Sequence, residues 1–429
     1  MRIILSPLIR KCLFCVMVFL IVFNPPIHKM ISFTTLFSVI SIVDLLIHFQ
    51  QTQWMLEKLR TPMRILFLSF LYYFIICVIN SLARNNDARI IFSNYIRSIG
   101  TFICQISVSL FIIRRAKQYE YSIKEIIGIF IFVGIMQGFI GLMCYVSPAI
   151  KSALNSIMIR NSEDGFAMIV QANSYRRNYG FASTLFDIFG FTMSILSVIA
   201  FSRAYIKKSM KDYLFFAIIT LAAVLNARTS IVLIGVGIII CVILSDIKKN
   251  DVKILTKKVC IAVMIIGGGV FSLRILEKSS SSTSIWLSSG ISEIRSFFHG
   301  DNTGFFNTLV NDFIFFPDSF LSTMFGTSMS PMELIDRSTD MGYIQSIWKY
   351  GIVGSIINYS FWIFLCRTAY RRRSDNQDGM LVITIFILIF VYQLKLNSWG
   401  YSMAGAVYYP VLMCIAMNDE IDNIEILLG

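Results

Sequence analysis

The chain has 429 residues, of which 56% are hydrophobic and 15% are charged, and its mean hydropathy is +0.70. Soluble domains carry about 25% charged residues and place their apolar residues in short periodic stripes. In spite of a net charge of +13, this composition excludes a nucleic-acid-binding protein, a secreted disulfide-rich module and a disordered chain. It indicates a polytopic membrane protein, in which Lys and Arg gather in cytoplasmic loops.

Apolar segments that approach the length of a membrane span recur along almost the whole chain. A spanning helix needs about 20 apolar residues. The segments are 12–27, 31–47, 63–79, 91–113, 125–146, 184–202, 213–226, 230–244, 259–273, 342–366, 380–394 and 402–417. We therefore expect an all-α polytopic membrane protein of about 12 transmembrane helices, which form a single integral membrane domain over residues 1–429.

The distribution of basic residues predicts how these helices are oriented. With the N-terminus in the cytoplasm, more than half of the 38 Lys and Arg residues fall on the cytoplasmic side, among them Arg60 and Arg64. The positive-inside rule therefore predicts that both termini are cytoplasmic. Two connections on the opposite face are long, 147–183 and 274–341. Loops of this length often carry function.

Ionisable side chains in or beside a span are expensive to insert, so each is a candidate functional residue. Several basic residues fall at the outer membrane–water boundary on this topology: Arg97, Arg176, Arg177, Arg228, Arg337, Lys349 and Lys395. Any single one is equally consistent with a side chain that anchors a helix end. As a set, guanidinium groups at this depth suit a phosphate or pyrophosphate. By contrast, Asp44 lies near the inner end of the second span, and we expect it to hydrogen-bond a neighbouring helix.

Three short motifs lie on the predicted outer side. The first is an R-x-x-G from Arg177 to Gly180, and the second is Asn226-Ala227-Arg228-Thr229-Ser230. The third is Phe325-Gly326-Thr327, followed by Asp340-Met341-Gly342-Tyr343 and, eight residues later, Gly351-Ile352-Val353-Gly354. In order, spacing and placement they resemble the motifs of the O-antigen polymerase and ligase superfamily (Wzy-type polysaccharide polymerases). The resemblance covers roughly residues 170–366.

Two departures from the family pattern bear on what the resemblance implies. Ala182-Ser183-Thr184 stand where a Pro-Asn pair often follows the R-x-x-G. Asp340 stands where ligases of the family carry a histidine, which favours a polymerase over a ligase.

The resemblance implies a glycosyltransferase of the bacterial inner membrane whose active site faces the periplasm, so that 147–183 and 274–341 are periplasmic loops. Such an enzyme polymerises undecaprenyl-pyrophosphate-linked repeat units into O-antigen or capsule. Its partners would be the lipid-linked glycan, the bilayer, a chain-length regulator and a repeat-unit flippase. Two alternatives stay open: an O-antigen ligase that transfers glycan to lipid A-core, and a flippase or other transporter. A flippase should carry charges through the full membrane depth and have short outer loops.

The chemistry of this transfer suggests roles for the candidate residues. A departing pyrophosphate needs fixed positive charge, and the attacking hydroxyl needs a base. The resemblance implies Arg177 and Arg228 for the first role and Asp340 for the second, with no metal and no cofactor required. The expected substrate-binding residues are Arg97, Arg176, Arg295, Arg337, Lys349 and Tyr343. Other candidate bases are Glu333, Asp336 and His299, and the simpler interpretation of Asp340 is an N-cap of the tenth span.

Overall fold

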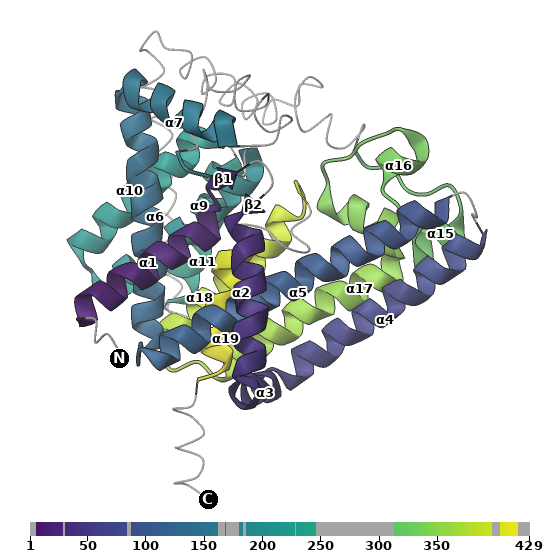
Figure 1. Ribbon diagram of the computed structural model, residues 1–429, viewed down its shortest axis with the longest axis horizontal. Helices are drawn as coiled ribbons and strands as arrows, with labels where there is room; N and C mark the ends of the chain where they lie inside the picture. Colours follow the sequence, from purple (N-terminus) through teal and green to yellow (C-terminus); the bar gives the residue numbers. More distant parts are fainter. Residues whose placement is uncertain are drawn as a thin grey trace, which may run out of the picture. The chain divides into compact units, whose positions relative to one another are not determined.

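The computed structural model describes residues 6–28, 31–83, 87–161, 168, 180–182, 186–227, 229–245, 313–396 and 404–418. Apart from two short strands, the regular structure in these ranges is helical (Figure 1). The strands β1 (Pro26–His28) and β2 (Ile31–Ser32) pair antiparallel. The helices are α1 (Pro7–Phe23), α2 (Phe33–Ile47), α3 (Phe49–Lys58), α4 (Arg60–Ala83), α5 (Ala88–Gln118), α6 (Ile123–Val146), α7 (Pro148–Asn161), α9 (Phe186–Lys207), α10 (Met210–Asn226), α11 (Thr229–Leu244), α15 (Phe320–Phe325), α16 (Pro331–Ile335), α17 (Gly342–Arg371), α18 (Asn376–Tyr392) and α19 (Gly405–Ala416).

Local capping chemistry explains where several of these helices begin. At the start of α6, the Ser122 hydroxyl accepts the N–H of Glu125 at 3.3 Å and the Glu125 carboxylate accepts the N–H of Ser122 at 3.1 Å. This reciprocal capping box satisfies two backbone donors that the first helical turn leaves free. Ser330 and Glu333 form the same arrangement at α16, with Pro331 in the first turn, where a missing N–H costs nothing.

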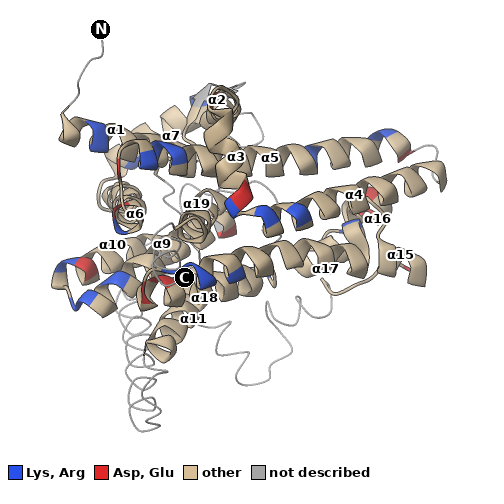
Figure 2. Ribbon diagram, turned by 90° about the horizontal axis from the view of Figure 1, so that it is seen from below, with Lys and Arg blue, Asp and Glu red and all other residues tan. Residues whose placement is uncertain are grey.

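Long apolar helices support the membrane-protein prediction. In the described residues, α4, α5, α6, α9 and α17 are long and apolar enough to cross a membrane, and the pair α2 and α3, bent by 99°, would make a sixth span. The charges of α4 lie at its beginning, next to α3, and the rest of the helix carries no charged residue (Figure 2). The chain is therefore an all-α protein with several apolar helices suited to a membrane.

The predicted spans coincide with helices wherever the structure describes them. A helix overlaps each predicted span except 259–273, which lies outside the described residues. Many of these helices are shorter than a full span, so the total of twelve and the placement of both termini stay predictions. The first predicted outer loop begins with a helix, α7, and the described part of the second contains α15 and α16.

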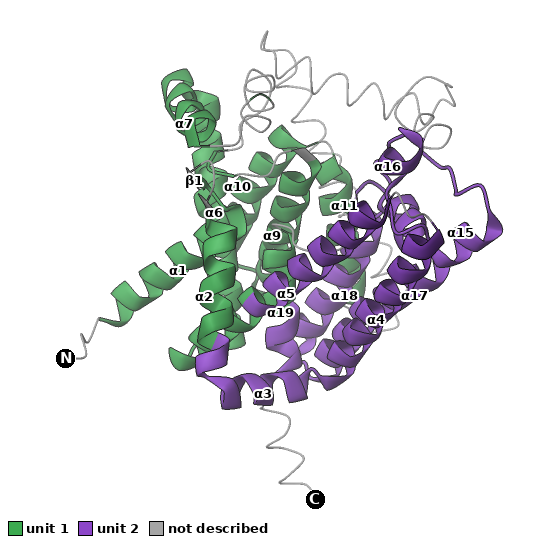
Figure 3. Ribbon diagram, turned by 45° about the vertical axis from the view of Figure 1, so that its right-hand side comes forward, with its two compact units in different colours: residues 1–44, 108–290, 403–411 green, residues 45–107, 291–402, 412–429 purple. Residues whose placement is uncertain are grey.

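The fold divides into two compact units, neither of which is continuous in sequence (Figure 3). Unit 1 comprises residues 1–44, 108–290 and 403–411, and unit 2 comprises 45–107, 291–402 and 412–429. In unit 1, α9 is the central helix, and α6, α10 and α11 pack against it. In unit 2, α17 packs against α4, α15 and α18. This division does not test the prediction of a single membrane domain.

Unit 1 contains a buried ion pair that confirms the structural role expected for Asp44. Near the end of α2, its carboxylate accepts hydrogen bonds from Arg114 Nε at 2.6 Å and from Arg115 Nη2 at 2.8 Å. The side chains of Asp44 and Arg114 are 8% and 5% exposed. A buried charge is tolerated only when it is paired and hydrogen-bonded, so this contact fixes α2 against the part of α5 that belongs to unit 1.

Replacing Asp44 tests this contact. We expect Asp44→Ala to lower the free energy of unfolding by about 3–5 kcal/mol, because Arg114 would stay buried without its carboxylate. Denaturant unfolding of the purified protein in detergent measures the change. The control is Lys11→Ala, whose pair with Glu125 is 45% and 44% exposed and should contribute about 0–1 kcal/mol. Equal losses from the two variants would contradict a special role for Asp44.

Candidate functional site

The central feature of unit 2 is a break in α17 at Gly351, where φ is 71° and ψ is 177°. The segment that follows α15 binds the backbone groups next to this break. Thr327 N–H donates to the carbonyl of Trp348 at 2.7 Å, and Ser328 N–H donates to the carbonyl of Lys349 at 3.1 Å. Thr327 and Ser328 therefore supply backbone hydrogen bonds at the interrupted turn.

Two glycines make this approach of backbone to backbone possible. A Cβ atom on Gly326, where φ is 89°, would lie 2.6 Å from the nitrogen of Gly351. A Cβ atom on Gly351 would in turn meet the carbonyl oxygen of Met324. Both positions have a positive φ that side chains disfavour. The close contact of residues 324–328 with the break in α17 is here called the crossing. It explains why glycine stands at two of the motif positions.

A tyrosine of α4 binds the same crossing from the other side. The Tyr72 hydroxyl lies 3.1 Å from the carbonyl oxygen of Phe325 and 3.1 Å from that of Tyr350. Both oxygens accept from this one donor, at the C-terminal end of α15 and at the break of α17. The break is consequently joined to α4 as well as to α15.

Lys349 lies just before the break and is half-buried among polar and aromatic side chains. Its Nζ donates a hydrogen bond to Ser98 Oγ of α5 at 2.7 Å and lies 5.6 Å from the ring centres of both Tyr73 and Tyr350. The two rings are buried and meet edge to face at 4.7 Å. Cations are stabilised over aromatic faces. Lys349, Ser98, Tyr73 and Tyr350, here called the Lys349 cluster, thus hold one positive charge in a defined place.

Glu333 provides a negative charge that interacts with Lys349 of this cluster. Both of its carboxylate oxygens accept from Asn94 Nδ2 of α5, at 3.1 and 3.0 Å, and one accepts from Ser330 N–H at 2.7 Å. Although burial raises the pKa of this carboxyl, the hydrogen bonds from Ser330 and Asn94 and the charge of Lys349 lower its pKa below the ordinary value. A carboxylate so stabilised is a weak base, which makes Glu333 a structural residue and a poor candidate for proton abstraction.

Asp340 is exposed and pairs with Lys395, which lies just after the end of α18. Its Oδ2 lies 3.1 Å from Lys395 Nζ, and the side chain of Asp340 is 52% exposed. The alternative interpretation of Asp340 as a helix cap is wrong, because the N-cap residue of α17 is Met341, whose N–H donates to Thr339 Oγ1 at 3.1 Å. Asp340 therefore presents a carboxylate to solvent beside a fixed cation.

The other predicted binding residues of unit 2 have distinct surroundings. Tyr343 donates its hydroxyl proton to the carbonyl of Phe390 at 2.8 Å, which attaches α17 to α18 and leaves the oxygen only as an acceptor. The guanidinium of Arg337 lies 4.0 Å from the ring centre of Phe315 and is exposed. Arg97 is exposed on α5, one residue before Ser98. Arg337, Lys349 and Asp340 all belong to the stretch that enters α17.

The predicted arginines of the first two motifs lie outside the described residues. These are Arg176, Arg177 and Arg228, and Arg295 and His299 of the second long loop lie outside them too. Within unit 1, Thr229 Oγ1 donates to Asp187 Oδ1 at 2.8 Å. This bond ties the start of α11, directly after Arg228, to the start of α9, which follows the R-x-x-G motif.

Comparison with known proteins gives no assignment for this site. No protein-family model matches the chain, and no curated protein matches it either. Among the residues that the structure describes, no three His, Cys, Asp or Glu side chains come together as ligands for a metal ion. The candidate site is therefore defined by its own charges and hydrogen bonds.

Two functional neighbours of Lys349 escaped the sequence analysis, although a signal for them exists. Asn94 and Ser98 are polar residues four positions apart in the predicted span over α5. That spacing places both on one face of a helix, and in a span it indicates a polar contact with another helix. Their partners, Glu333 and Lys349, are too distant in sequence to be inferred in the same way.

Substituting the break glycine tests whether the crossing organises the site. Gly351→Ala should destabilise the protein by about 1–3 kcal/mol, because only glycine readily adopts this backbone conformation, and further because its Cβ would collide with the carbonyl of Met324. Gly100→Ala in α5 is the control, since its Cβ would meet nothing within 4 Å, and it should be neutral or stabilising by up to about 1 kcal/mol. Thermal unfolding in detergent compares them. A Gly351→Ala protein as stable as the control would contradict the close crossing.

Proposed function

We propose that this protein is a glycosyltransferase that polymerises undecaprenyl-pyrophosphate-linked oligosaccharide repeat units into a surface polysaccharide, O-antigen or capsule, at the periplasmic face of the bacterial inner membrane. The observation that carries the proposal is the set of charges where the chain enters α17: the ion pair of Asp340 with Lys395, the exposed Arg337 and the half-buried Lys349. The positive-inside rule assigns this end of unit 2 to the outer side of the membrane.

These charges suit the two demands of the transfer. Asp340 would take the proton of the attacking sugar hydroxyl, whose oxygen forms a bond to the anomeric carbon of the glycan on a second lipid carrier. The bond from that carbon to the pyrophosphate oxygen breaks, and undecaprenyl pyrophosphate leaves with the electron pair. Lys349 would stabilise the negative charge that develops on the leaving group, and the resemblance implies the same role for Arg177 and Arg228.

Fixed positions are what make such charges useful for catalysis. A charge held before the reaction costs no reorganisation when the transition state forms. Lys349 has this property, since Ser98 Oγ accepts a hydrogen bond from its Nζ at 2.7 Å and two buried tyrosine rings flank it. We assign Arg337 and Arg97 to contacts with the glycan or headgroup, because both are exposed, and Tyr343 to positioning α17 against α18.

The broken helix favours a second candidate, a transporter of lipid-linked repeat units. Many transporters form their substrate sites at discontinuous helices, where backbone groups are free to bind a ligand. In α17, however, Thr327 and Ser328 of the same chain bind the carbonyls at the break. The groups that a transported substrate would use are thus occupied, which makes the polymerase the better-supported proposal.

Surface glycan from a bacterial host that lacks the chromosomal gene tests the proposal. Variants Lys349→Met, Asp340→Asn, Arg177→Ala and Arg228→Ala should each lower polymer yield by about 100-fold or more, with one capped repeat retained on the gel and normal protein abundance by immunoblot. Arg177→Lys and Arg228→Lys should restore polymer only in part, because lysine lacks the planar fork.

The control for this experiment is Arg371→Gln, which removes an exposed charge at the far end of α17 and should leave the ladder intact. Complete loss of capped glycan in the deletion strain would support a flippase or a ligase instead. Wild-type ladders from all four variants would refute the site.

A further inference from the structure

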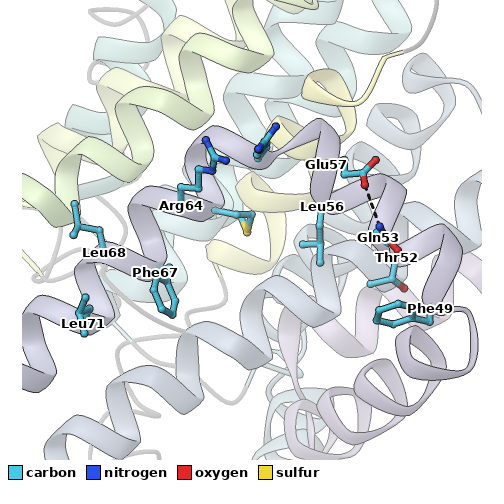
Figure 4. A pocket seen from close by; sticks show the side chains of 11 residues that line it. Phe49, Thr52, Gln53, Leu56, Glu57, Arg64, Phe67, Leu68 and Leu71 are labelled. Atoms are coloured by element: carbon cyan, nitrogen blue, oxygen red, sulfur yellow. Dashed lines mark hydrogen bonds between the residues drawn. The ribbon is translucent and has the colours of Figure 1, made fainter.

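A groove between α3 and α4 in unit 2 is unrelated to the Lys349 cluster in its residues and its chemistry. Its volume is about 1040 Å³. Figure 4 shows Phe49, Gln53 and Leu56 along α3 and Arg64, Phe67 and Leu71 along α4. Most of the lining is apolar, and the polar groups gather where α3 meets α4.

The apolar lining of the groove is open to the surroundings of the protein. Phe49, Phe67, Leu68 and Leu71 are 62%, 70%, 50% and 45% exposed. The most apolar window of α4 has a mean hydropathy of 2.3, yet only 33% of it is buried inside the protein. So large an apolar surface is stable only when hydrocarbon covers it, and in a spanning helix that hydrocarbon is lipid.

Two arginines give the polar end of the groove a net positive charge. Arg60 and Arg64 both line it and lie four residues apart, on one face of α4. The acidic residue of the lining, Glu57, accepts a hydrogen bond from Gln53 Nε2 at 3.1 Å. Two guanidinium groups against one carboxylate favour an anion, and the planar fork of arginine suits phosphate oxygens.

The length of the groove corresponds to one leaflet of a membrane. From Arg60 to Leu71 a helix rises about 16 Å, at about 1.5 Å per residue. Half of a hydrocarbon core about 30 Å thick is about 15 Å. Arg64, Phe67, Leu68 and Leu71 follow the spacing of one helix face, so a single lipid molecule can contact both the arginines and the apolar stripe.

The orientation of α3 agrees with a position at the membrane surface. The axis of α3 is bent by 99° from that of α2, so α3 runs along the surface if α2 crosses the membrane. Lys58 Nζ lies 5.5 Å from a ring centre of Trp54 on this helix. Tryptophan and lysine are typical anchors at the membrane–water interface.

We propose that the α3–α4 groove binds one anionic phospholipid of the surrounding leaflet. Arg60 and Arg64 bind its phosphate, and an acyl chain lies along Phe67, Leu68 and Leu71. The lipid covers the exposed stripe of α4 and joins α3 to α4 from outside. Lipid binding at this site needs no glycan substrate. The proposal of a lipid site is therefore independent of the proposed glycosyl transfer.

The test measures binding of phosphatidylglycerol to the full-length protein in detergent by native mass spectrometry. Arg60→Gln/Arg64→Gln should weaken binding about 5-fold per arginine, or roughly 30-fold in all. Arg89→Gln/Arg371→Gln removes the same charge from exposed positions outside the groove and should bind like the wild type. If the first double variant fails to fold, the single variants Arg60→Gln and Arg64→Gln should each bind about 5-fold more weakly.

Two further ligands separate a lipid from a free anion. Phosphatidylcholine should bind more weakly than phosphatidylglycerol, and inorganic phosphate should not compete with the lipid. Equal binding by the wild type and Arg60→Gln/Arg64→Gln would overturn the proposal. Displacement of the lipid by inorganic phosphate, or an equal loss in the control variant, would also overturn it.

Discussion

The arrangement of unit 2 depends on one close contact of backbone with backbone, where Gly326 meets Gly351. Backbone hydrogen bonds from a loop to the interior of a helix are uncommon, because the interior N–H and C=O groups already bind one another. Here the positive φ of Gly351 interrupts α17, and Thr327 and Ser328 bind the carbonyls at the break. The absence of a Cβ on either glycine lets the two segments approach closely enough for these bonds to form. The loop after α15 is thereby fixed to a long apolar helix.

This contact determines where the charges of the candidate site lie. Lys349 sits in the last regular turn before the break, and its side chain reaches Ser98 of α5. The segment that continues from Ser328 leads to α16, whose Glu333 is bound by Asn94 from the same face of α5. Lys349 and Glu333 are thus each bound by a side chain of α5, and these two side chains lie on neighbouring turns of that helix. The cost of placing such charges beside hydrocarbon is offset by these hydrogen bonds, and a preorganised cation is what departing pyrophosphate requires.

Composition and hydropathy predict much of the secondary structure, because apolar runs in a membrane protein have few alternatives to a helix. The position of Asp44 in an apolar run predicts its hydrogen bonds to another helix, which Arg114 and Arg115 provide. The sequence does not predict the break in α17 or the partner of Asp340. The turn before Gly351 contains no proline and is compatible with a continuous helix, and Lys395 is 55 residues from Asp340. Contacts of this range depend on how helices pack, which a periodic pattern does not encode. Arg177 and Arg228 remain assigned by resemblance, since both lie outside the described residues.

The purified protein in lipid vesicles allows the most direct measurement of the proposed reaction. An undecaprenyl-pyrophosphate-linked repeat unit is supplied on the side of the protein that carries Asp340, and mass spectrometry follows both glycan length and free undecaprenyl pyrophosphate. The polymerase predicts lipid-linked products of two or more repeats, with one undecaprenyl pyrophosphate released for each new linkage, and loss of both signals in Lys349→Met. Movement of unchanged single repeats across the vesicle membrane, with no elongation and no release of the carrier, would contradict the account and identify a transporter.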